Sequence, residues 1–290
     1  MSMIETTGTI LDWDVTTVKR AGLSRDLPSG KPDLMWVANS STLIYGERDA
    51  ILVDTFLTAG QSKTLLDWVV SRERNLTAIY VTHGHGDHFF GLAPLLDRFP
   101  RASAVAVPEV VDEMKTQLSP ASLDGFWRKR FPGEIAQRLV AAEPLEGELT
   151  LEGHKLVVID MGPTDTARST ALHVPSLDLI VAGDTVYNGI HPYLDLAETD
   201  TQSRLEWIAA LDRLEALKPR FVVAGHKKPE NDDDPRNIAE TRQYLLDFNR
   251  LDQATISPRE LYEAMLALHP DRANPGSLWS GANAAKGPRS

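Results

Sequence analysis

The segment that most constrains this chain is a cluster of metal-ligand residues placed directly after the apolar run 78–82: His83-Gly84-His85-Gly86-Asp87-His88. It contains three of the chain's eight histidines. Imidazole and carboxylate groups bind zinc and related ions, and the two glycines let the backbone turn tightly enough to aim them at one point. Burying these groups without a partner would cost on the order of several kcal/mol. The pattern therefore predicts a metal-binding loop at the end of a strand.

Two later segments follow the same logic. Each is an apolar run that ends in a glycine and then a ligand-type residue. The run 179–183 leads to Asp184, and the run 221–225 leads to His226. Three such strand ends can converge on one edge of a sheet. A carboxylate between two cations would neutralise charge that otherwise repels.

The alternation of apolar runs and amphipathic stretches divides the chain into parts. Residues 1–33 are polar and rich in Thr, Gly and Pro, whereas the region after Pro270 is rich in Ala, Gly, Asn and Ser. We predict an N-terminal arm with at most one strand (1–33), a central domain (34–252), and a C-terminal helix with a loose tail (253–290).

Strands and helices alternate in the central domain, which suits either a doubly wound sheet or a two-sheet sandwich. The early hairpin over 42–53 favours a four-layer αββα sandwich. Residues 108–147 are predicted to form a helical insert near the site. Phe126 and Trp127 in this insert either anchor it to the core or form a pocket wall.

Composition limits the partners and ligands. The net charge of −11 argues against binding of nucleic acid. The absence of cysteine means that metal ligands must be nitrogen and oxygen atoms. The N-terminus resembles no signal peptide, and no run approaches the roughly 18 apolar residues of a membrane span. We therefore expect a cytoplasmic protein that does not bind membranes, with its oligomeric state left open.

The motifs resemble those of the metallo-β-lactamase fold superfamily. The resemblance rests on Thr82 to His88, Ala182-Gly183-Asp184 and Ala224-Gly225-His226, together with the hairpin over 39–55, and it covers roughly residues 34–245. It implies an αββα sandwich of α/β class with metals in a groove at the sheet edges. By position it implies a first metal on His83 and His85, a second on Asp87, His88 and His226, and Asp184 as the bridge between them.

One departure from that family concerns the first metal. The family usually supplies a third histidine in a Gly-His-Thr turn, where this chain reads Gly162-Pro163-Thr164-Asp165. Proline offers no ligand atom, so we expect the first site to be weak or empty and the second to bind more tightly. Asp165 or a water molecule is the candidate substitute. His173, within a predicted strand, is expected to be structural.

The resemblance implies a metal-dependent hydrolase of a small-molecule ester-type bond, such as a lactone or thioester. A bound cation lowers the pKa of its water from about 15.7 toward 7, and the hydroxide so formed attacks the substrate. Zinc is the expected ion, one or two per chain, although iron and manganese also accept nitrogen and oxygen ligands. Asp87 is expected to orient the water and to shuttle its proton.

Tyr187 follows Asp184 by three residues, as a tyrosine does in the acyl-homoserine lactone lactonases of the superfamily. Its expected catalytic role is to donate a hydrogen bond to the oxyanion, and the alternative is a tyrosine packed at a strand end. Pro163 leaves a second function open, namely a metal-stabilised binding or sensing protein with reduced or lost catalysis.

Overall fold

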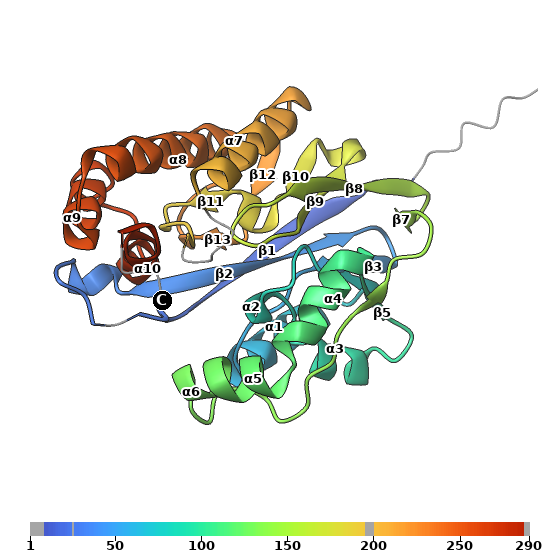
Figure 1. Ribbon diagram of the computed structural model, residues 1–290. Helices are drawn as coiled ribbons and strands as arrows, with labels where there is room; N and C mark the ends of the chain where they lie inside the picture. The colour runs from blue at the N-terminus through green and yellow to red at the C-terminus, as the bar shows by residue number, and fades with distance from the viewer. Residues whose placement is uncertain (1–8, 25, 195–199, 287–290) are drawn as a thin grey trace, which may run out of the picture.

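The computed structural model describes residues 9–24, 26–194 and 200–286 as four layers (Figure 1). Two β-sheets pack face to face, and helices cover the outer face of each sheet. The predicted αββα sandwich is confirmed.

The larger sheet has the strand order β11-β13-β2-β3-β4-β5-β6, with β1 paired to β2. Its strands are β1 (Asp12–Ala21), β2 (Trp36–Tyr45), β3 (Asp49–Val53), β4 (Asn75–Tyr80), β5 (Ser103–Ala106), β6 (Glu143–Pro144), β11 (Tyr187–Asn188) and β13 (His226–Lys227). The smaller sheet has the order β12-β10-β9-β8-β7. Its strands are β7 (Leu149–Leu151), β8 (His154–Gly162), β9 (Ser169–Val174), β10 (Leu179–Val181) and β12 (Phe221–Val223).

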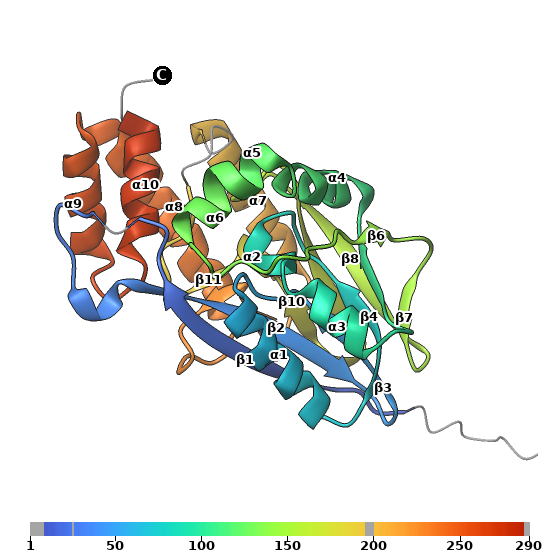
Figure 2. The same cartoon turned by 90° about the horizontal axis from the view of Figure 1, so that it is seen from below.

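The helices form the two outer layers (Figure 1). One set of helices packs on or beside the larger sheet. It consists of α1 (Ala59–Ser71), α2 (Gly86–Phe89), α3 (Leu92–Arg98), α4 (Pro108–Gln117), α5 (Pro120–Ser122), the π-helix η2 (Leu123–Trp127) and α6 (Arg128–Arg130). Figure 2 shows the molecule from below, with α1 and α3 in front of the larger sheet. The helices that pack on the other side of the molecule are α7 (Thr201–Ala216), α8 (Arg236–Ala254), α9 (Pro258–Leu268) and α10 (Pro275–Lys286). No described helix is long and apolar enough to cross a bilayer.

Side-chain alternation along the central strands explains the layers. In β3, Ala50 and Leu52 face the helices of the outer layer, whereas Ile51 and Val53 face the smaller sheet. Successive side chains of a strand point to opposite faces, so an apolar run of this kind is buried on both sides. The ends of these buried strands are rigid supports for the loops that follow them.

The N-terminal arm contributes more than its composition suggested. Strand β1 pairs with β2 over ten residues, from Asp12 opposite Tyr45 to Ala21 opposite Trp36. The larger sheet therefore begins well before residue 34, the predicted start of the central domain.

The C-terminal segment is not loose within the described residues, which corrects the expectation from composition. Helix α10 buries Leu278 and Ala282 and packs Trp279 against Tyr262, with ring centroids 5.3 Å apart. Its small residues permit close packing instead of flexibility, because a Cβ on Gly281 would lie only 3.1 Å from Leu194.

Candidate metal centre

The motif residues lie on three loops, one after β4 of the larger sheet and two after the paired strands β10 and β12 of the smaller sheet. Residues 81–85 follow β4 and lead into α2, Asp184 lies in a short 3-10 turn after β10, and His226 starts β13 just after β12. Glycine is needed where two of these loops cross, because a Cβ on Gly225 would collide with the Asp184 carboxylate. Strand ends thus bring the three motifs to one edge of the sandwich.

One set of ligand atoms, the first ligand group, comes from His83, His85 and Asp165. Asp165 Oδ2 lies 2.9 Å from His85 Nδ1 and 3.7 Å from His83 Nε2. The other carboxylate oxygen of Asp165 accepts a hydrogen bond from Thr164 Oγ1 at 2.9 Å, which leaves Oδ2 to face the histidines. The Asp165 carboxylate thus lies beside His83 and His85. These are the two histidines of the first ligand group, which lacks a third histidine because Pro163 stands at that position.

The second ligand group consists of Asp87, His88 and His226. His226 Nε2 lies 3.5 Å from Asp87 Oδ2. Asp184 is close to the same histidines, with Oδ1 3.3 Å from His88 Nε2 and Oδ2 3.1 Å from His226 Nε2. It also groups with His83 of the first ligand group. Asp184 is therefore near both ligand groups, as a bridging carboxylate must be.

Four atoms of this cluster are buried and make no hydrogen bond of good geometry among the described residues: His83 Nε2, His88 Nε2, Asp165 Oδ2 and Asp184 Oδ1. They face other ligand atoms at ion-pair distance, such as His85 Nδ1 at 2.9 Å from Asp165 Oδ2. A buried polar atom left without a partner costs about 1–3 kcal/mol. All four are nitrogen or carboxylate oxygen donors, which zinc, iron and manganese accept. The residues present therefore fit divalent cations.

Hydrogen bonds on the outer side fix the imidazole rings. Asp54 Oδ2 lies 3.0 Å from His88 Nδ1, and the Ala38 carbonyl oxygen lies 3.0 Å from His226 Nδ1. Asp54 itself accepts hydrogen bonds from the backbone N–H and the hydroxyl of Thr82, at 2.8 and 2.7 Å. With Nδ1 engaged, Nε2 of each ring is left for a cation.

Two residues that were not predicted as site residues hold Asp87. Arg20 Nη2 donates to Asp87 Oδ2 at 2.7 Å, and Asn39 Nδ2 donates to the same oxygen at 3.0 Å. Burial by itself would raise the pKa of Asp87, but Arg20, followed by His88 and His226, holds this pKa far below its usual value. Asp87 is therefore a carboxylate at neutral pH.

The two histidines of the first ligand group differ in their affinity for a proton. Burial, with the neighbouring His88, lowers the pKa of His83 to about 4. Burial also opposes a charge on His85, but Asp165 outweighs this effect and raises the pKa of His85 to about 9. A cation that binds to this group must displace the proton from His85.

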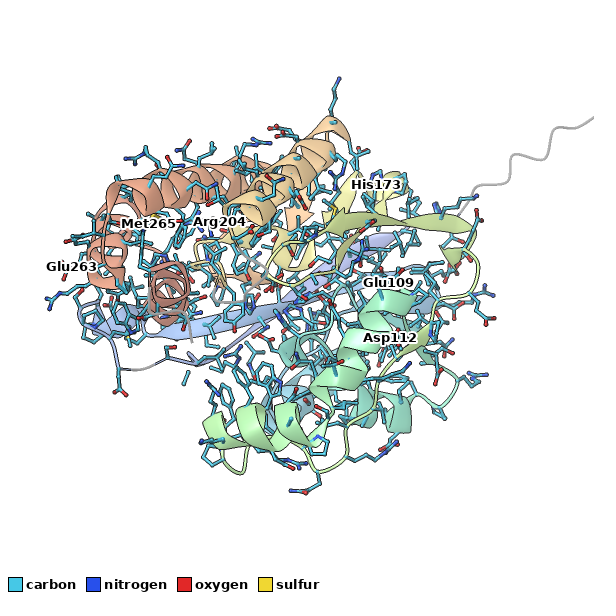
Figure 3. All side chains as sticks on the ribbon, viewed as in Figure 1. Glu109, Asp112, His173, Arg204, Glu263 and Met265 are labelled. Atoms are coloured by element: carbon cyan, nitrogen blue, oxygen red, sulfur yellow. The ribbon has the colours of Figure 1, made fainter. Side chains whose placement is uncertain are left out.

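Tyr187 lies beside the bridging position. Its hydroxyl donates to Asp184 Oδ2 at 2.7 Å, and its ring stacks on His226 with centroids 5.5 Å apart. Burial and the Asp184 charge raise the pKa of Tyr187 well above its usual value, so the hydroxyl keeps its proton. By contrast, His173 is half-buried on β9 and belongs to none of the ligand groups found among the described residues (Figure 3).

A cavity of about 370 Å³ lies beside the ligand groups. Asp165 and Asp184 form part of one wall, and Phe126 and Trp127 of the insert form another. Trp127 is also buried in the core of the outer layer, so this aromatic pair both anchors the insert and lines the cavity. Ser277 at the start of α10 completes the lining from the C-terminal end.

A comparison with protein families places most of the chain in a known family. The family model of the metallo-beta-lactamase superfamily matches residues 34–226. This range is about two thirds of the chain and includes the six predicted ligand residues as well as Asp165.

Curated relatives cover part of this chain. A hydroxyacylglutathione hydrolase of Actinobacillus pleuropneumoniae serotype 5b is 28% identical over 182 residues, 62% of this chain and 60% of that protein. The alpha subunit of the 2,4-dinitroanisole O-demethylase of Nocardioides sp. is 30% identical over 187 residues, 63% of this chain and 51% of that protein. The chain thus matches 60% or less of the length of these two relatives.

Solved structures share the fold. A metallo-beta-lactamase family protein from Thermus thermophilus aligns with a TM-score of 0.61 and 22% identity, over 93% of this chain and 91% of that chain. A beta-lactamase domain protein from Burkholderia ambifaria aligns with a TM-score of 0.62 and 15% identity, over 93% and 84%.

Proposed function

Because the chain belongs to the metallo-beta-lactamase superfamily, we propose that it is a metal-dependent hydrolase of an ester-type bond in a small molecule. One observation carries the proposal: four buried nitrogen and carboxylate oxygen atoms, all suited to bind a metal ion and without hydrogen-bond partners among the described residues, converge beside a cavity of about 370 Å³. A bound divalent cation supplies Lewis acidity and lowers the pKa of its water from about 15.7 toward 7. A metal-activated water of this kind can hydrolyse esters, thioesters and lactones at neutral pH.

Two cations per chain is the loading we propose, one on each ligand group, with Asp184 between them. The expectation of a weak first site rested on Pro163, and the position of Asp165 beside His83 and His85 favours a filled one. Zinc is the first candidate because it accepts imidazole and carboxylate ligands at neutral pH. Iron and manganese suit the same donors.

The chain's own residues orient the reactants. Tyr187 lines the cavity, and its hydroxyl, which keeps its proton and donates to Asp184, would be able to donate instead to the substrate oxygen on which negative charge develops. Asp87, charged and held by Arg20, is a ligand that accepts a hydrogen bond from the attacking water. The low pKa of Asp87 makes it a poor proton acceptor, so we propose that it orients the water and does not shuttle its proton.

The substrate range follows from the cavity. The relatives are named for hydroxyacylglutathione and 2,4-dinitroanisole, but the match leaves at least 40% of each relative uncovered. The aromatic wall of Phe126 and Trp127 favours a substrate with an apolar body. Small lactones, thioesters and esters are therefore the proposed class.

A metal-stabilised binding or sensing protein is the second candidate, because Pro163 departs from the usual ligand pattern. It would retain the ligand groups and the bound ions, and would lack turnover. Turnover, and not metal content, distinguishes the two candidates.

The test combines metal content with turnover. We expect elemental analysis of protein purified without added metal to give close to two ions per chain, and the loaded protein to hydrolyse members of a panel of lactones, thioesters and aryl esters. His88→Ala should abolish turnover, whereas His173→Ala is the matched control outside the ligand groups. Unchanged turnover in both His88→Ala and Asp184→Ala would contradict the proposal. Ions without turnover of any panel member would favour the binding protein.

A further inference from the structure

The cavity offers a substrate no exposed cation, since the guanidinium on its described lining is buried and ion-paired, with only Nε lacking a hydrogen-bond partner. Arg20 is the one permanent cation on its described lining, and Arg20 Nη2 already donates to Asp87 at 2.7 Å, with 7% of the arginine side chain exposed. Away from the ligand groups, much of the wall is aromatic or neutral, as at Phe126, Trp127 and Gln117. An anionic tail would lose its hydration here without gaining a partner. This wall therefore favours a substrate whose remote part is uncharged.

His191 belongs to the same wall, and the function proposed above does not use it. Its side chain is fully buried, and its Nδ1 lies 3.0 Å from the Tyr244 hydroxyl. Its backbone N–H donates to the Ala273 carbonyl oxygen at 2.9 Å. Tyr244 is held in turn by Arg272, whose guanidinium lies 5.1 Å from the centre of the tyrosine ring. The imidazole of His191 is therefore fixed in one orientation.

One ring nitrogen of His191 remains for another molecule. His191 Nε2 is buried and has no hydrogen-bond partner in the described part of the chain. His191 lines the cavity and Tyr244 does not, so we infer that Nε2, and not Nδ1, is the ring nitrogen nearer the cavity.

The protonation of His191 follows from its neighbours. A phenol is the stronger donor and an imidazole nitrogen the stronger acceptor, so the Tyr244 hydroxyl donates to Nδ1 and the ring proton resides on Nε2. Burial, followed by the charges of Arg272 and His269, lowers the pKa of His191 well below its usual value. The ring is therefore neutral and presents one N–H donor.

We propose that His191 is a substrate-binding residue whose Nε2–H donates to a neutral oxygen acceptor remote from the scissile bond. The inference rests on the hydrolase function proposed above and narrows its substrate class. That class is an uncharged ester, thioester or lactone with an apolar body and a second carbonyl or ether oxygen. A substrate without this oxygen would leave the Nε2–H of His191 buried and unpaired. Because an unpaired buried donor costs free energy, such a substrate should bind more weakly.

Three 4-nitrophenyl esters of similar size test the proposal with zinc-loaded protein: the butanoate, the 4-oxopentanoate and the hydrogen succinate. The 4-oxopentanoate should have a kcat/KM about 5- to 10-fold above that of the butanoate, mainly through KM, since it alone adds a neutral acceptor. The anionic succinate should be the poorest substrate.

Variants separate binding from structure. His191→Phe should lower kcat/KM for the 4-oxopentanoate by a larger factor than for the butanoate, so that the ratio of the two falls to about 1. His191→Gln, whose amide can donate, should restore part of that ratio. His173→Phe is the matched control. Equal kcat/KM for butanoate and 4-oxopentanoate in the wild type, or an equal loss for both in His191→Phe, would overturn the proposal. A preference for the succinate would also overturn it, although the hydrolase function would stand.

A binding measurement decides the inference even if no ester is hydrolysed. The probe is acetanilide, which has an aromatic ring and a neutral carbonyl, added to zinc-loaded protein labelled with ¹⁵N-histidine. The His191 signal, identified by its loss in His191→Phe, should shift on addition of acetanilide. An unchanged signal up to the solubility limit would overturn the proposal. A shifted signal without turnover of any ester would refute the hydrolase function alone.

Discussion

Replacing Asp165 with alanine tests whether this carboxylate takes the place of a missing histidine ligand. Asp165 is fully buried with Oδ2 2.9 Å from His85 Nδ1, so the variant removes one of three donors from the first ligand group. A four-ligand zinc site contributes about 10–16 kcal/mol, or about 3 kcal/mol per ligand. This corresponds to a dissociation constant about 100-fold higher at the first site, with a change of less than about threefold at the second.

Competition between the metal-free protein and a fluorescent zinc chelator measures both constants. Asp112→Ala, which removes a largely exposed carboxylate from α4, is the matched control. Wild-type affinity at both sites in Asp165→Ala would show that Asp165 is not a ligand. An equal loss at both sites would show that the two ligand groups bind as one unit. Either result would refute the reasoning.

Three further predictions concern pH, ligand support and the C-terminal helix. Zinc affinity at the first site should fall about tenfold per pH unit below pH 9, because a proton must leave His85, whose pKa is raised to about 9, before the ion binds. Zinc titrations at pH 7 and pH 8 measure this change. Equal affinities at the two pH values would contradict the prediction. Asp54→Ala should weaken zinc at the second site by about 10- to 100-fold in calorimetric titration, and an unchanged constant would exclude support through His88. Leu278→Ala should lower the free energy of unfolding, measured in urea, by about 2–5 kcal/mol. The control is Leu268→Ala, at a half-exposed position, which should change this free energy by less than about 0.5 kcal/mol. Equal small effects of the two substitutions would show that α10 is not docked.

Local signals were sufficient to predict the fold and the meeting of the motifs. Apolar runs that end in glycine and a ligand-type residue mark strand ends, and strand ends at one edge of a sheet must lie close together. Asp184 and His226 lie close together for that reason, because they follow the paired strands β10 and β12 of the smaller sheet. His83 follows β4 of the larger sheet, and it lies near Asp184 because the two sheets pack face to face. Asp165 was identified as a candidate by residue type, but its orientation depends on a hydrogen bond from Thr164 that no pattern indicates.

The residues around the ligands were not predictable in the same way. Arg20 lies 67 positions from Asp87 in the chain, and it reaches Asp87 because β1 pairs with β2. Tyr244 is 53 positions from His191, and their contact depends on how α8 packs. The C-terminal segment was predicted wrongly because a composition rich in Ala and Gly is common to loose chains and to closely packed helices.

The contribution of α10 to the cavity sets an order of events during synthesis. His226 is the last of the proposed ligands in the chain, and Ser277 of the cavity wall follows it by about 50 residues. During synthesis, all the ligands therefore leave the ribosome before this part of the wall. At translation rates of about 5–20 residues per second, this interval is about 3–10 s. During that time a nascent chain can present its ligand atoms to cellular metal while the wall supplied by α10 is still missing. Loading with metal can therefore precede closure of the cavity.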